Sequence, residues 1–237
     1  CSFCCWGEDI AVDKSTLDTK IIKKCIYDMK KLGAKAICFT GGGEPMIHKD
    51  FYKILSFTKK NDLDCGLITN GSAITKEHCS ELVNNLQWLR VSVSGGDAAS
   101  YKKVQGKDHF ERVINNIEML AKEKVKKNSD IKIGIRMLVN EVNLYTLLKL
   151  AKRIKDINGI NYLQISPNQF SDDEGKFWNG PDVDNEIKKT EKILKTGNIE
   201  LLTSSFEILS TSKEEQQKLI NYPKRCYAHF YQITIMA

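Results

Sequence analysis

Short β-branched segments and longer amphipathic segments alternate along most of this chain. Segment 19–32, for example, carries apolar side chains at Ile22, Ile26 and Met29, which is the period of a helix. Repeated strand–helix units with short connections predict a parallel sheet with helices outside it. We expect strands at 35–40, 65–69, 88–94, 131–139, 162–166 and 199–202, and helices at 19–32, 51–59, 76–86, 110–120, 144–154 and 184–195.

The number of predicted strands fits either an incomplete barrel or an open doubly wound sheet. The chain starts on a cysteine, and residues 232–237 read as part of a strand. We therefore expect an interior fragment whose first strand lies upstream of residue 1. The strand–helix alternation ends near residue 203, so we predict an α/β domain at 1–202 and the start of a C-terminal extension at 203–237.

Composition narrows the classes of protein to consider. The net charge of +6 is spread over lysine-rich helix faces, without a basic stripe interleaved with aromatic residues, so we do not expect nucleic-acid binding. No apolar run approaches the roughly 20 residues of a membrane span, so we expect no membrane association. No secretory signal precedes the cysteines, which favours a reducing cytoplasmic compartment.

The eight cysteines occur in two kinds of setting. We expect small buried thiols where single cysteines stand in apolar helix or strand patterns, at Cys25, Cys38, Cys65 and Cys79. Cys1 and Cys4 instead form a C-x-x-C pair, which places two thiolates within reach of one metal ion or iron–sulfur cluster. A zinc site needs a second pair at finger or ribbon spacing, and none follows nearby, so zinc is the weaker option.

A glycine run, Gly41-Gly42-Gly43, precedes Glu44 and Pro45 directly after a predicted strand. Such a run is typical of a turn whose backbone cradles a phosphate or small ligand, with a plain tight connection as the alternative. It is neither a dinucleotide-binding motif nor a Walker loop, because no Lys-Ser/Thr follows it. His48, just beyond, is expected to be a loop residue rather than a ligand.

Together these motifs resemble the signature of the radical S-adenosylmethionine (radical SAM) enzymes, C-x3-C-x-Φ-C followed by G-G-E-P. Cys1 and Cys4 match the last two cysteines, with Phe3 at the aromatic position Φ, and the first cysteine is expected four residues upstream. A register that pairs Cys1 with Cys5 needs a third cysteine at position 8, where Glu8 stands. Cys5 is therefore not expected to be a ligand.

The ends of later predicted strands extend this resemblance over about residues 1–167. Segment 68–71 resembles the end of the family's third strand. The family usually shows Ser-x-Asp in its fourth strand, whereas this chain has Ser92 and Ser94, and a serine hydroxyl can still hydrogen-bond a ribose. Segment 136–143 resembles the fifth strand, which makes Arg136 a candidate partner for the cofactor carboxylate. An ordinary surface ion pair is the competing interpretation of Arg136.

The resemblance implies a partial (β/α)6 barrel with its chemistry at the C-terminal ends of the strands. It implies a 4Fe-4S cluster held by Cys1, Cys4 and an upstream cysteine, and reductive cleavage of S-adenosylmethionine to a 5′-deoxyadenosyl radical that abstracts hydrogen from a substrate. It assigns no catalytic acid or base. The implied cofactor contacts are Phe3, Gly41, Gly42, Gly43, Glu44, Ser92, Ser94 and Arg136, with the backbone of residues 41–44 receiving the cofactor's amino group.

The tail gives a second resemblance. The sequence from Cys226 to Phe230 and the strand-like residues after it are similar to the entry of the SPASM or twitch extension, which binds auxiliary iron–sulfur clusters in many of these enzymes. This implies that Cys226 is an auxiliary-cluster ligand, and a structural cysteine is the alternative.

The resemblance leaves the substrate open among peptides, sugars and small metabolites, with flavodoxin or ferredoxin as the expected electron donor. Two other interpretations compete with it. A non-catalytic module whose C-x-x-C pair holds zinc or a structural cluster leaves the glycine turn unexplained. A sugar-phosphate barrel enzyme that uses residues 41–43 as a phosphate loop leaves Cys1 and Cys4 unexplained.

Overall fold

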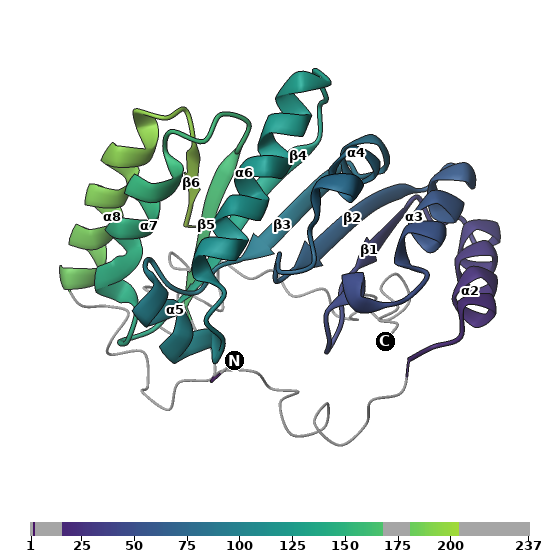
Figure 1. Cartoon of the computed structure of the whole chain (residues 1–237), viewed down its shortest axis with the longest axis horizontal. Coiled ribbons are helices and arrows are strands. Elements are labelled where there is room, and N and C mark those ends of the chain that lie inside the picture. Colours follow the sequence, from purple (N-terminus) through teal and green to yellow (C-terminus); the bar gives the residue numbers. More distant parts are fainter. Residues whose placement is uncertain (1, 3–15, 168–180, 204–237) are drawn as a thin grey trace, which may run out of the picture.

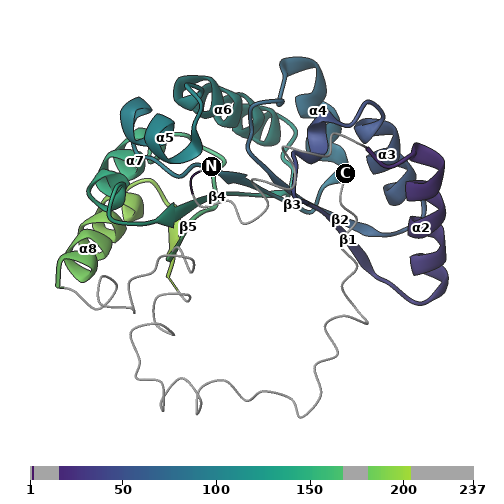
Figure 2. The ribbon, with the colours of Figure 1, turned by 90° about the horizontal axis from the view of Figure 1, so that it is seen from below.

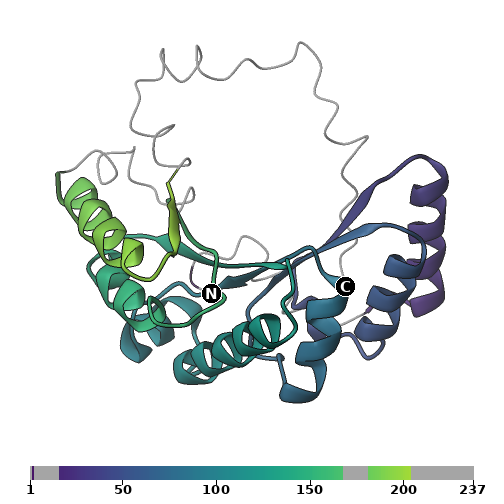
Figure 3. The ribbon, with the colours of Figure 1, turned by 90° about the horizontal axis from the view of Figure 1, so that it is seen from above.

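The computed structural model of the chain describes residue 2 and residues 16–167 and 181–203. Their strands form one six-stranded parallel sheet in chain order. The sheet curves but does not close (Figures 1 and 3), which confirms the predicted α/β fold and its incomplete barrel. The strands are β1 (Ala36–Phe39), β2 (Asp64–Thr69), β3 (Trp88–Ser92), β4 (Lys132–Val139), β5 (Tyr162–Pro167) and β6 (Glu200–Leu202).

The labelled helices all cover the convex face of this sheet (Figure 2). That arrangement and the consecutive strand order argue against a doubly wound sheet, which carries helices on both faces. None of the described helices is long and apolar enough to cross a membrane. The helices are α2 (Thr19–Lys31), α3 (Phe51–Lys60), α4 (Lys76–Asn85), α5 (Ala98–Gln105), α6 (Phe110–Lys126), α7 (Leu147–Ile154) and α8 (Pro181–Lys195), with 3-10 turns η1 (Pro45–Ile47) and η2 (Leu144–Thr146).

Two features of the helical layer were not anticipated. Helix α5 is short and only weakly amphipathic, so hydrophobic periodicity does not reveal it. Its signal is at its start, where Asp97 and Ser100 form a reciprocal capping box. The segment expected as one helix at 144–154 divides into η2 and α7.

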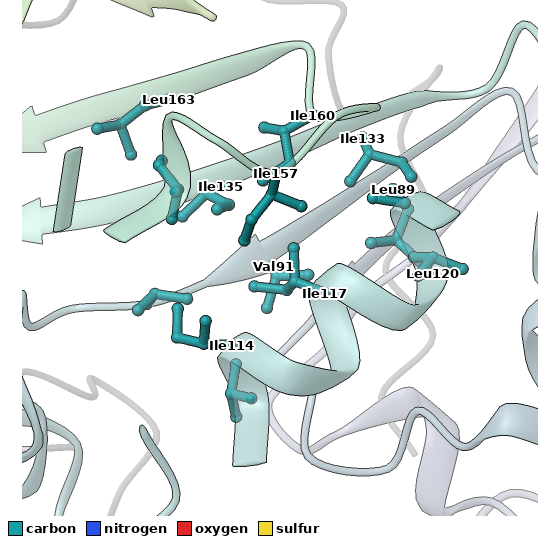
Figure 4. Packing of buried hydrophobic residues seen from close by; sticks show 14 of the residues in the cluster. Leu89, Val91, Ile114, Ile117, Leu120, Ile133, Ile135, Ile157, Ile160 and Leu163 are labelled. Atoms are coloured by element: carbon teal, nitrogen blue, oxygen red, sulfur yellow. The ribbon is translucent and has the colours of Figure 1, made fainter. Parts of the chain in front are cut away.

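The core lies between the convex face and the helices. Alternate residues of a strand point to opposite faces, and on the central strands the odd-numbered residues face the helices. Helix α6 packs its apolar stripe on them, as Figure 4 shows. The fully buried residues at this contact include Leu89, Val91, Ile133 and Ile135 from the strands and Ile114, Ile117 and Leu120 from α6.

The single cysteines differ in how far their side chains are buried. Cys65 and Cys79 are buried, as expected, and Cys25 is half-buried. The expectation of a buried thiol at Cys38 is wrong, because this side chain is exposed. Cys38 lies on the concave side of β1, which is an edge strand of the described sheet.

Candidate functional site

The glycine run forms the loop that leaves the C-terminal end of β1, and Glu44 fixes its far side. The Glu44 side chain accepts hydrogen bonds from the Thr69 hydroxyl (2.7 Å), the Asn70 N–H (2.7 Å) and the Met46 N–H (3.2 Å). One carboxylate therefore caps η1 and joins the loop to the end of β2. Burial raises the pKa of the Glu44 carboxyl, although these hydrogen bonds oppose that shift.

The Glu44 side chain is hydrogen-bonded within the protein, whereas the glycines before it border open space. Gly41 and Gly43 line a hollow of about 720 Å³. Cys38, Gly66 and Trp88 on the concave side of the sheet also line it. Apolar residues of α2, among them Ile22, Ile26 and Met29, line the same hollow, so it extends from the glycine turn along the edge strand β1.

His48 stabilises the base of the same loop. Its Nδ1 accepts from the Asp50 N–H (3.1 Å), which leaves Nε2 to donate to the carbonyl of Leu17 (2.9 Å). The residue is buried. Both ring nitrogens are occupied within the protein, which agrees with a loop residue rather than a metal ligand.

The two serines at the end of β3, Ser92 in the strand and Ser94 just after it, have different surroundings. Ser92 lies on the concave face in register with Arg136 and is half-buried. Ser94 is 2% exposed, its N–H donates to Gln105 Oε1 (2.6 Å), and its hydroxyl accepts from the Leu138 N–H (3.3 Å). Ser94 thus joins the end of β3 to β4, and Ser92 is the more accessible hydroxyl.

Arg136 lies on the concave face near the C-terminal end of β4. Its side chain is half-buried, and its Nε is buried without a hydrogen-bond partner among the described residues. Burial lowers the pKa of Arg136, and the charge of Arg90 on the next strand lowers it further. The expectation of an ordinary surface ion pair finds no support in the described part of the chain, where Arg136 has no salt bridge.

Sequence reasoning missed three further polar residues on this face. Arg90 donates through Nη1 to Gln164 Oε1 (2.8 Å), across the strand between them. Ser166, at the end of β5, is 2% exposed and its hydroxyl is buried without a partner among the described residues. The missed signal is the alternation itself, since every second residue of β3 and β5 after the first is polar while the intervening ones are apolar.

A model of the radical SAM superfamily matches residues 1–138, which is more than half of the chain. The chain belongs to the radical SAM superfamily. The glycine loop, Ser92 and Arg136 all lie within the matched region.

Two curated relatives are similar over most of this chain. The AdoMet-dependent heme synthase of Methanosarcina barkeri is 28% identical over 164 residues, which make up 68% of this chain and 45% of that protein. The probable GTP 3′,8-cyclase of Pyrococcus abyssi is 28% identical over 159 residues, 65% of this chain and 50% of that protein. The chain thus spans about half the length of the curated relatives it matches.

A solved structure shows the same fold. Native anSMEcpe, with bound AdoMet and Kp18Cys peptide, matches with a TM-score of 0.65 at 17% identity, over 85% of this chain and 59% of that one. At this identity the likeness concerns the fold of the radical SAM domain.

The predicted cluster ligands Cys1 and Cys4, the aromatic Phe3 and the auxiliary ligand Cys226 lie outside the described residues. Ser2, between them, donates its backbone N–H to the carbonyl of Val104 in α5 (2.9 Å). Among residues 16–167 and 181–203, no group of three or more His, Cys, Asp or Glu side chains lies together as a metal site.

The described part of the site fits S-adenosylmethionine. At the C-terminal edge of the sheet it offers glycine backbone, a serine hydroxyl at Ser92 and the incompletely hydrogen-bonded polar side chains of Arg136 and Ser166. Buried polar groups of this kind ordinarily have partners, so their presence here points to a polar ligand.

Proposed function

We propose that this chain is the catalytic domain of a radical SAM enzyme that abstracts hydrogen from a bound substrate. The observation that carries the proposal is that the glycine loop, Ser92 and Arg136 all lie toward the C-terminal ends of parallel strands in a member of this superfamily. In barrels of this type the C-terminal ends of the strands carry the chemistry. When bound, a 4Fe-4S cluster and S-adenosylmethionine supply one-electron cleavage of the sulfonium bond and a carbon radical that takes hydrogen.

The chain's own residues bind the cofactor and orient it. The backbone of Gly41, Gly42, Gly43 and Glu44 receives the cofactor's amino group, and the carboxylate of Glu44 keeps that backbone in place. The guanidinium of Arg136 pairs with the cofactor's carboxylate, because its planar fork of donors matches a carboxylate and its Nε has no partner among the described residues.

The ribose contact falls to the serines at the end of β3. Ser92 is the primary hydroxyl because it is accessible and level with Arg136. Ser94 is more buried than Ser92. Its hydrogen bond to β4 fixes the strand end at which the ribose binds. Phe3 completes the cofactor contacts from the cysteine motif.

The cluster ligands in this proposal are Cys1 and Cys4, together with an upstream cysteine. Residues 203–237 begin a SPASM-like or twitch-like extension, and Cys226 is a ligand of an auxiliary cluster there. Reduction by a flavodoxin or ferredoxin in the cytoplasm completes the scheme.

The substrate is a peptide, a sugar or a small metabolite. The named relatives differ in the same way, since they are a heme synthase and a GTP cyclase, and the matching solved structure holds a peptide.

Substitution of neighbouring cysteines tests the ligand assignment. In the intact protein, reconstituted anaerobically with iron and sulfide, we expect Cys4→Ala to lose the iron and the absorbance of this cluster. Cys5→Ala is the matched control and keeps iron near the wild-type content. Iron content and electron paramagnetic resonance measure both variants. Normal iron in Cys4→Ala, or cluster loss in Cys5→Ala, contradicts the assigned register.

A further inference from the structure

Two arginines stand on neighbouring strands of the concave face at different depths. Arg136 is in register with Ser92, whereas Arg90 lies two residues earlier on β3, level with Gly134. A strand rises about 3.3 Å per residue, so Arg90 starts about 7 Å further from the C-terminal edge. The charge of Arg90 contributes to the lowered pKa of Arg136, after burial, so the two guanidinium groups interact.

Neither charge is neutralised within the described part of the chain. No salt bridge there involves Arg90 or Arg136, and the Nε of each is buried without a hydrogen-bond partner. The strands carry two described carboxylates on this face, Asp64 and Glu200, both exposed at the first positions of β2 and β6. Glu200 is level with Tyr162 but forms no salt bridge with either arginine, and it lies three strands from Arg90. Partly buried cations without a counter-charge are costly, so this face is built to receive an anion.

The groups around Arg90 are hydrogen-bond donors. Because Gln164 Oε1 accepts from Arg90 Nη1 (2.8 Å), the amide NH₂ of Gln164 can donate to a ligand, and it has no acceptor within the described residues. Tyr162 is level with Arg90 in the sheet, and the charge of Arg90 lowers the pKa of its phenol, against a larger rise from burial.

A glycine makes room for this grouping. Gly134 lies between Arg90 and Tyr162 in the register, and a Cβ there would come within 2.0 Å of the Tyr162 ring. Only glycine therefore allows the ring to lie over β4, beside the path by which Arg90 reaches Gln164.

We propose that Arg90, Gln164 and Tyr162 form an anion pocket that binds a carboxylate or phosphate group of the substrate. This inference rests on the proposed function, in which Arg136 serves the cofactor's carboxylate one layer nearer the strand ends. The substrate class is thus anionic. Its charged group is anchored in the middle of the concave face, and the reacting part of the molecule extends toward the cofactor.

Titration with two small anions tests the pocket directly. Tricarballylate and inorganic pyrophosphate are titrated calorimetrically into the anaerobically reconstituted intact protein, with and without saturating S-adenosylmethionine. We expect at least one anion to bind and Arg90→Gln to weaken it at least tenfold. Arg112→Gln, at an exposed position of α6, is the matched control and changes the affinity less than twofold. The tighter anion tells whether the substrate group is a carboxylate or a phosphate.

A second variant keeps the test valid if Arg90→Gln fails to fold. Gln164→Glu places a carboxylate against Arg90, so it should abolish anion binding while raising the melting temperature, since it supplies the missing counter-charge. The proposal is overturned if neither anion binds to the wild type, if Arg90→Gln or Gln164→Glu binds normally, or if S-adenosylmethionine displaces the anion. Failure of the proposed function is a separate result, because it shows as absent cofactor cleavage while the anion still binds.

Discussion

At the scale of single residues, Glu44 explains how a glycine run becomes a loop of defined position. Three glycines have little conformational preference of their own, so their position depends on what holds the loop's ends. The carboxylate of Glu44 does this through Thr69, Asn70 and Met46. The residue therefore acts by positioning the backbone before it rather than by contacting a ligand with its side chain.

Replacement of Glu44 by glutamine should destabilise the protein by about 1–3 kcal/mol, the usual cost of a buried polar group left without a partner. The new amide NH₂ would face the Asn70 N–H or the Met46 N–H, neither of which can accept, so one hydrogen bond is lost. Urea unfolding at neutral pH measures the change. Glu141→Gln, at an exposed position after β4, is the control and should be neutral. Equal stability of the two variants contradicts the role given to Glu44.

At the scale of elements, Asp97 connects the short helix α5 to α7. Its side chain accepts from the Ser100 N–H (2.9 Å) as the N-cap of α5, and from Lys149 Nζ of α7 (2.6 Å). Next to it, a Cβ on Gly96 would lie 1.7 Å from the carbonyl of Thr146, so the loop after β3 packs directly on the turn before α7. These contacts fix the C-terminal ends of β3 and β4, which carry Ser92 and Arg136.

Asp97→Ala should lower the stability by about 0.5–2 kcal/mol near neutral pH, as loss of an N-cap does. The Lys149 hydrogen bond, and then those with Ser100, lower the pKa of Asp97 from 3.8 to about 2. A lowered acid pKa gives stability that is present above 3.8 and lost as the pH falls through about 2. Denaturant unfolding from pH 6 to pH 3 should therefore show the wild-type advantage shrinking, and Asp108→Ala, on an exposed pair, should show little effect. A constant difference between wild type and Asp97→Ala across this range argues against the ionised cap.

At the scale of the whole molecule, the strand–helix alternation was sufficient to predict the sheet, because strands and helices differ in the spacing of their apolar residues. The predicted strand at 162–166 and the observed β5 differ by one residue. Helix α5 was not predicted, because its stability comes from a cap and from packing on its neighbours, and hydrophobic periodicity shows neither. The exposure of Cys38 followed from its face on an edge strand, and that depends on the sheet's neighbours.

The candidate site was predicted only where a motif names a residue. The glycine loop and Arg136 were proposed in this way. Arg90 was not, because its importance lies in a hydrogen bond to Gln164, 74 residues away, and in the absence of a partner charge in the described chain. Contacts such as this hydrogen bond form only when the sheet places β3 and β5 on the two sides of β4.

The measurement that tests the central claim most directly is the release of 5′-deoxyadenosine, followed by chromatography. The intact protein is reconstituted anaerobically with iron and sulfide and supplied with S-adenosylmethionine and a strong reductant. We predict release by the wild type and by Arg112→Gln, and at least tenfold less by Arg136→Gln when the cofactor is below saturation. A reducible cluster that yields no 5′-deoxyadenosine would contradict the account.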